Sequence, residues 1–160
     1  MAWLRRAGQG IDPEGASVRW SVAEGSRGRR WRWTVLEGTA IRAAGLLELD
    51  SQGRFARLEY ETVAGTLTLH PDPDGRSAHG NLVHTEGVDP VRLPWEIDRG
   101  VRIRGDAFGS ALCPGEGSVV EVDARGSVQV ADARMTTGPL TVDERGVPVL
   151  AGAAEWPLET

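Results

Sequence analysis

The chain carries few side chains that could take part in a reaction, and two of them stand out. His79 lies in Ala78-His79-Gly80-Asn81, where a polar side chain within a strand could form a polar spot on a barrel wall. Tyr60 is the only tyrosine and places a hydroxyl on an apolar strand face. If the protein is an enzyme, Tyr60 and His79 are the candidate catalytic groups. The alternative for His79 is a side chain that simply faces water.

Other catalytic and metal-binding patterns are absent from the sequence. Asp72 and Asp74 before Gly75 resemble part of a calcium loop, but Pro73 interrupts it and the distal Glu is missing, which favours a turn. Cys113 is the only cysteine, so the chain has no internal disulfide and no Cys/His cluster suited to zinc. No glycine-rich phosphate loop leads into a helix. We therefore expect no metal site, no cofactor and an inert Cys113.

Composition narrows the range of partners and locations. The 160 residues carry 23 acidic and 18 basic side chains, a net charge of −5 that disfavours nucleic-acid binding. The cluster Arg27, Arg29, Arg30 and Arg32 is interpreted as a solvated strand edge and face. No apolar run reaches the roughly 18 residues of a membrane span, and no signal peptide is recognisable. We predict a cytoplasmic protein without a membrane span.

Four turns with one shared pattern connect the apolar runs of the chain. In each, Asp is followed three residues later by Gly, which is typical of a type I turn whose Asp caps the backbone and whose Gly takes a positive φ. The four segments are Asp50–Gly53, Asp72–Gly75, Asp123–Gly126 and Asp143–Gly146. They predict a series of hairpins.

The segments between the turns alternate apolar and polar residues with a period of two. About ten to twelve short strands follow, with one helical turn at most, near Asp106 to Leu112. Pro94 indicates an edge strand or a bulge. We predict an all-β fold, an antiparallel meander closed or half-closed into a curved, barrel-like sheet with little helix. One domain spans residues 1–160, with a core at 16–151 and arms at 1–15 and 152–160.

The inward faces of the predicted strands are rich in aromatic residues. They present Trp20, Trp31, Trp33, Tyr60 and Trp95, which would line an apolar concavity and contact a ligand. One hypothesis is a small-molecule or lipid-binding protein whose partner is hydrophobic or amphipathic. A second is a small barrel cyclase or isomerase for a hydrophobic, natural-product-like substrate. A third is a non-catalytic β domain whose core is simply filled.

The C-terminal segment Leu140-Thr-Val-Asp-Glu-Arg-Gly-Val-Pro-Val-Leu150 resembles the closing hairpin of a bacterial family named for glycolipid binding. An early Trp strand, the strand Leu58–Tyr60 and the Gly87–Asp89 segment before Leu93-Pro94 are similar in layout. The chain departs from the family pattern at Val149-Leu150, where Tyr-Pro is expected, and at Val91-Arg92, where Thr-Asn is expected. The resemblance implies a curved sheet around an apolar concavity, and only this architecture is carried over from the family.

Overall fold

The protein is built almost entirely from β-strands. The computed structural model describes residues 4–96, 100–113, 117–122, 128–135 and 140–157. The elements in chain order are β1 (Arg5–Ile11), β2 (Ser17–Gly25), β3 (Gly28–Glu37), β4 (Ala40–Leu49), β5 (Phe55–Thr62), β6 (Gly65–Pro71), β7 (Ser77–His84), β8 (Gly87–Pro94), β9 (Gly100–Ile103), α1 (Ala107–Ser110), β10 (Gly117–Val122), β11 (Val128–Met135) and β12 (Ala151–Pro157).

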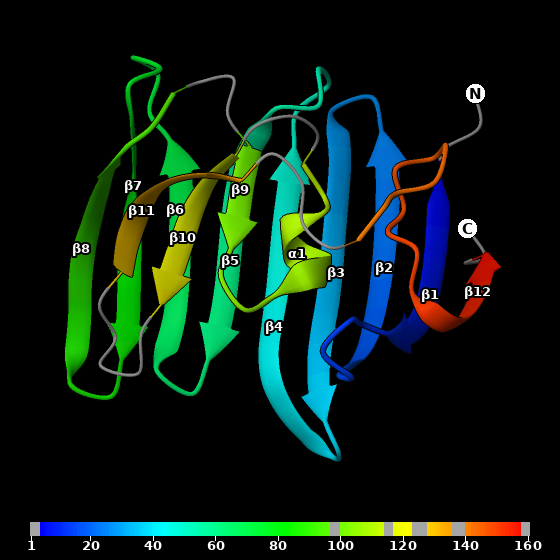
Figure 1. The fold of residues 1–160 in the computed structure, drawn as a ribbon. Coiled ribbons are helices and arrows are strands. Elements are labelled where there is room, and N and C mark those ends of the chain that lie inside the picture. The colour runs from blue at the N-terminus through cyan, green and yellow to red at the C-terminus, as the bar shows by residue number, and fades with distance from the viewer. Residues whose placement is uncertain (1–3, 97–99, 114–116, 123–127, 136–139, 158–160) are drawn as a thin grey trace.

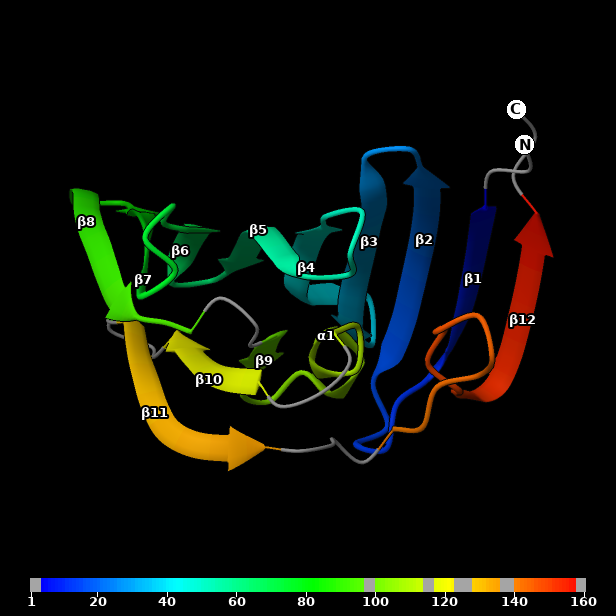
Figure 2. The ribbon, with the colours of Figure 1, turned by 90° about the horizontal axis from the view of Figure 1, so that it is seen from above.

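Nine strands form one antiparallel sheet in the order β12-β1-β2-β3-β4-β5-β6-β7-β8 (Figure 1). The sheet is curved and half-open, since its edge strands β12 and β8 do not pair with each other. A smaller sheet, β11-β10-β9, lies with α1 on the concave side (Figure 2). The prediction of an all-β meander is confirmed in its half-closed form. The parallel pairing of β9 with β10 is the departure from a pure meander.

The Asp-x-x-Gly turns form as predicted wherever the structure describes them. In the turns that begin at Asp50, Asp72 and Asp143, the Gly N–H donates to the Asp carbonyl at 3.0 Å, and each Gly has a positive φ. A fifth turn of this pattern, Asp12–Gly15, joins β1 to β2 and was missed in the sequence. The predicted turn Asp123–Gly126 lies outside the described residues.

The regions expected to be arms contribute a strand each to the large sheet. β1 pairs with β2 on one side and with β12 on the other, so the regular structure extends beyond residues 16–151. The sequence of β1 does not show a clear alternation of apolar and polar residues, because Gly8 occupies an inward position. Gly8 lies beneath the Trp20 indole, where a Cβ would clash with the ring. A glycine that makes room for an aromatic ring belongs to the core although it contributes no side chain to the pattern.

Two prolines in the edge strand β8 make this edge of the large sheet unfavourable for pairing with a further strand. Pro94 lies in this edge strand, as the sequence predicted, and Pro90 precedes it. The Trp95 N–H donates to the Arg76 carbonyl, so the register places both proline nitrogens on the side that faces away from β7. Because proline has no N–H to offer there, the edge is a poor template for another strand.

Candidate functional site

Phe108 from α1 fills the centre of the concave side. Its ring lies 6.3 Å from Trp20, 6.0 Å from Trp31 and 6.2 Å from Trp33, measured between ring centroids. Phe108 and Trp31 are fully buried. The short helix turn predicted near Asp106 to Leu112 is confirmed, and its aromatic side chain occupies the space between the three indoles.

The structure brings together four of the five residues predicted to contact a ligand. Tyr60 lies 6.3 Å from Trp33, and therefore beside the group of indoles around Phe108. Trp95 is separate from this group and packs against Phe55 at 5.3 Å. All five are buried. They form the packed interior of the protein, and Trp20 also borders a small cavity of about 150 Å³ next to Leu150.

A buried carboxylate connects α1 to the large sheet. One oxygen of Asp106 accepts hydrogen bonds of 2.8 Å from the Trp33 indole N–H and from the Tyr60 hydroxyl. The other oxygen accepts a 2.8 Å bond from the Gly109 N–H and caps the helix turn. Asp106 is only 2% exposed. Three donors thus satisfy a carboxylate that would otherwise be costly to bury.

The same contacts set the chemistry of the only tyrosine. Burial, followed by the charge of Asp106 and the hydrogen bond to it, raises the pKa of Tyr60 far above its ordinary value of 10.0. The hydroxyl therefore remains protonated and acts as a donor to Asp106. This arrangement anchors Tyr60 in the core.

Tyr60 and His79 lie on opposite faces of the sheet. Tyr60 faces the concave core, whereas the His79 side chain is 54% exposed on the convex face and bonds to Asp72. The structure therefore does not bring the two candidate catalytic groups together. A reaction that uses both on one substrate molecule has no common site here.

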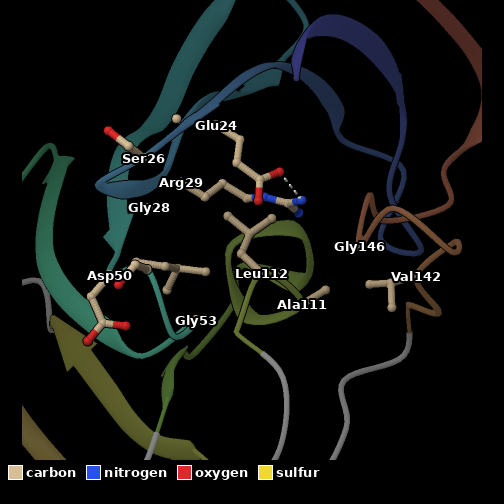
Figure 3. A pocket seen from close by; sticks show the side chains of 13 residues that line it. Glu24, Ser26, Gly28, Arg29, Asp50, Gly53, Ala111, Leu112, Val142 and Gly146 are labelled. Atoms are coloured by element: carbon tan, nitrogen blue, oxygen red, sulfur yellow. Dashed lines mark hydrogen bonds and ion pairs between the residues drawn. The ribbon is translucent and has the colours of Figure 1, made fainter. Parts of the chain in front are cut away.

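A pocket of about 630 Å³ opens at one end of the curved sheet, at the turns β2–β3 and β4–β5. We call it the mouth pocket. Figure 3 shows the Leu112 side chain below the Glu24–Arg29 pair, with Asp50 on one side of it and Val142 on the other. Its lining residues are Glu24, Gly25, Ser26, Gly28, Arg29, Leu49, Asp50, Ser51, Gly53, Ala111, Leu112, Val142 and Gly146. Apolar side chains and an ion pair thus line the same space.

Arg29 is the central charged residue of the mouth pocket. Its guanidinium donates to Glu24 at 2.8 Å and to the Arg145 carbonyl at 2.8 Å. The guanidinium carbon also lies 5.9 Å from the centre of the Trp31 ring, within the range of a cation–π contact. The Trp31 indole N–H has no hydrogen-bond partner among the described residues, in contrast to that of Trp33. Arg29 thus separates the aromatic core from the opening.

A second charged group borders the mouth pocket at the β4–β5 turn. Partial burial opposes the charged form of Asp50, but hydrogen bonds from the backbone and side chain of Arg54 and from the Gln52 N–H outweigh it and lower the pKa. Figure 3 shows the Asp50 carboxylate directed away from the Glu24–Arg29 pair. Asp50 therefore maintains the turn and leaves Glu24 and Arg29 as the polar groups at the centre of the pocket.

Sequence reasoning missed the residues that organise this region. Asp106 was not recognised as the partner of Trp33 and Tyr60, although Asp106-Ala-Phe-Gly109 repeats the Asp-x-x-Gly spacing and could have been identified as a helix cap. Arg29 was interpreted as part of a solvated cluster. A usable signal was its position two residues before Trp31, which places both on the same strand face.

Comparisons with known proteins do not indicate a function for this chain. No family model matches the chain, and neither the curated proteins nor the solved structures contain a match. In the described part of the chain, no three or more His, Cys, Asp or Glu residues are grouped to hold a metal ion. Among the same residues, no helix has the length and apolar character required to cross a membrane.

Proposed function

We propose that the protein binds a small amphipathic or lipid-like molecule without transforming it, and that the ligand occupies the mouth pocket. The observation that carries the proposal is the combination of Leu49, Leu112 and Val142 with the Glu24–Arg29 ion pair in one pocket. The apolar residues would contact the hydrophobic part of the ligand. The ion pair offers a guanidinium and a carboxylate to its polar end.

The size of the pocket is compatible with this role. A volume of about 630 Å³ lies within the roughly 300–1,000 Å³ typical of small-molecule sites. Burying about 300 Å² of apolar ligand surface would contribute roughly 7 kcal/mol before the costs of association. Micromolar affinity corresponds to about 8 kcal/mol net, so apolar contact of this size gives weaker binding unless hydrogen bonds to the Glu24–Arg29 pair add to it.

The identity of the ligand is proposed from the sequence. The resemblance to a family named for glycolipid binding favours a lipid or glycolipid, and the Glu24–Arg29 pair could hydrogen-bond to hydroxyl groups. The net charge of −5 makes a nucleic acid a poor partner. A cytoplasmic location is proposed with the single cysteine as support.

A β domain with a filled core is the second candidate. Phe108 supports it, because this side chain occupies the aromatic concavity that a carrier would otherwise leave open. On this alternative the mouth pocket is a surface depression without a ligand. The cyclase or isomerase alternative is less favoured, since Tyr60 and His79 lie on opposite faces of the sheet.

A blocking substitution tests the proposal directly. Val142 is 49% exposed at the pocket, so Val142→Trp should fill the space without disturbing the core. The matched control is Val63→Trp, at an exposed position in the β5–β6 turn. Binding of a dansyl-labelled fatty acid and of anilinonaphthalene sulfonate would be measured by fluorescence. Native mass spectrometry and lipid extraction of the purified protein would be run in parallel.

The expected result is probe binding that Val142→Trp abolishes and Val63→Trp preserves. Arg29→Met should weaken binding of the carboxylate probe while retaining the aliphatic stem above Trp31. The proposal fails if nothing co-purifies and neither probe binds, which would favour the filled-core domain. It also fails if the probes bind equally well to the native protein and to Val142→Trp.

A further inference from the structure

Two of the three histidines in the chain face each other across neighbouring strands. His70 of β6 and His79 of β7 are cross-strand partners on the convex face, with ring centroids 5.8 Å apart and an angle of 35° between the planes. Two imidazoles that share one metal ion have ring centres about 5–6 Å apart, because each coordinating nitrogen lies roughly 2.1 Å from the ion. The observed spacing fits such a shared ion.

A carboxylate orients one of the two rings. Asp72 bonds to Nδ1 of His79 through one oxygen, and its other oxygen accepts a hydrogen bond from the Ser77 hydroxyl. An Nδ1–H that donates to a carboxylate leaves the lone pair on Nε2. Metal-binding histidines commonly have such a carboxylate behind them, which fixes the ring and increases its basicity. His79 is therefore prepared to coordinate through Nε2.

His70 is the half-buried member of the pair, and its ring lies beside that of the more exposed His79. The charged groups that face the pair are Glu48, Arg57, Glu59, Asp72 and Arg92. Glu48 is itself paired with Arg30 at 2.9 Å, so the charges around the pair are balanced and the two imidazoles are the groups that would bind the ion.

We propose that His70 and His79 form a surface site for one divalent transition-metal ion of the class that prefers imidazole, namely Zn²⁺, Ni²⁺ or Cu²⁺. The two histidines supply two ligands, and water completes the coordination shell. Ca²⁺ and Mg²⁺ prefer oxygen ligands and are excluded from such a site. The site lies on the convex face and does not depend on the function of the mouth pocket.

Titration of the untagged, full-length protein with Ni²⁺ or Cu²⁺ by calorimetry tests the site. His70→Ala and His79→Ala should each abolish the one-to-one binding step. The matched control is His84→Ala, because His84 is the third histidine and bonds to Asp89 at 2.9 Å instead of joining the pair. Asp72→Asn should weaken binding by about tenfold or more, since it removes the orienting carboxylate.

Two further measurements keep the outcome interpretable. Circular dichroism of each variant must match that of the native protein, which is expected for substitutions on the convex face. The electron paramagnetic resonance spectrum of the Cu²⁺ complex should show two equivalent imidazole nitrogens. The proposal is overturned if the double variant His70→Ala/His79→Ala binds as tightly as the native protein, if His84→Ala removes binding, or if only one nitrogen coordinates.

Discussion

Asp106 offers the sharpest test of how this fold is held together. Its carboxylate accepts three hydrogen bonds of 2.8 Å, from Trp33, Tyr60 and Gly109, in the interior of the protein. Asp106→Ala leaves three buried donors without an acceptor, at about 1–3 kcal/mol each. Allowing for relaxation and non-additivity, we expect a loss of about 3–6 kcal/mol in the free energy of unfolding. That is a large part of the roughly 5–15 kcal/mol of a typical domain.

A double-mutant cycle separates this hydrogen-bond centre from simple loss of volume. Tyr60→Phe removes one donor and should cost about 1.5–3 kcal/mol in the native background, because the acceptor is charged. In the Asp106→Ala background the same substitution should cost clearly less, since the hydroxyl has already lost its partner. The free energies would come from urea unfolding followed by tryptophan fluorescence, with the slope m checked for two-state behaviour.

Two results would refute the reasoning about Asp106. A loss below about 1 kcal/mol for Asp106→Ala would mean that its buried donors find other partners at little cost. An equal cost of Tyr60→Phe in both backgrounds would mean that the hydroxyl and the carboxylate are energetically independent. Asp106→Asn should be intermediate, because its amide provides only one acceptor oxygen for three donors.

Four further predictions follow from single features of the structure. Burial, followed by a neighbouring carboxylate, raises the pKa of Tyr60, so stability should fall as the pH rises above the unfolded value of 10.0, and tyrosinate absorbance should appear only with unfolding. Gly8→Ala should cost about 1–3 kcal/mol by steric overlap in urea unfolding, whereas Gly25→Ala, with open space around it, should be nearly neutral. Phe108→Ala should cost about 3–5 kcal/mol in the same assay. The pKa of His70 is lowered mainly by burial, so protonation of this side chain favours the unfolded chain. The stability that the neutral side chain contributes is present above pH 6.5 and is lost as the pH falls below 6.5. Melting curves of His70→Gln should lack this dependence on pH.

The parts of the fold that depend on local chemistry could be predicted from the sequence. The turn at Asp50 needs only an Asp that accepts backbone N–H groups and a Gly with a positive φ, and both lie within four residues of each other. The inward row of β3 could likewise be derived from alternation. Pro94 identified the edge strand because a missing N–H is a local property.

The parts that depend on contacts across long stretches of chain could not be predicted in this way. The bond between Asp106 and Trp33 joins residues 73 positions apart, and that between Asp106 and Tyr60 spans 46 positions. Periodicity shows which face of a strand is apolar, but it does not show what covers that face. β1 was missed for a related reason, since Gly8 contributes to the core through the space it leaves for Trp20.

Whether an aromatic face encloses a ligand or forms a core depends on a residue outside the sheet. The inward row of β3 begins with Arg29 and continues with Trp31 and Trp33. Phe108 packs against both indoles, so the middle of the row is occupied by the protein itself. The guanidinium at the head of the row is 21% exposed and paired with Glu24, so it reaches solvent where the buried indoles do not. Arg29 therefore marks the opening, and a ligand entering here would meet the Glu24–Arg29 pair before any indole. Substitutions at the mouth should consequently change binding, whereas substitutions of the indoles should primarily change stability.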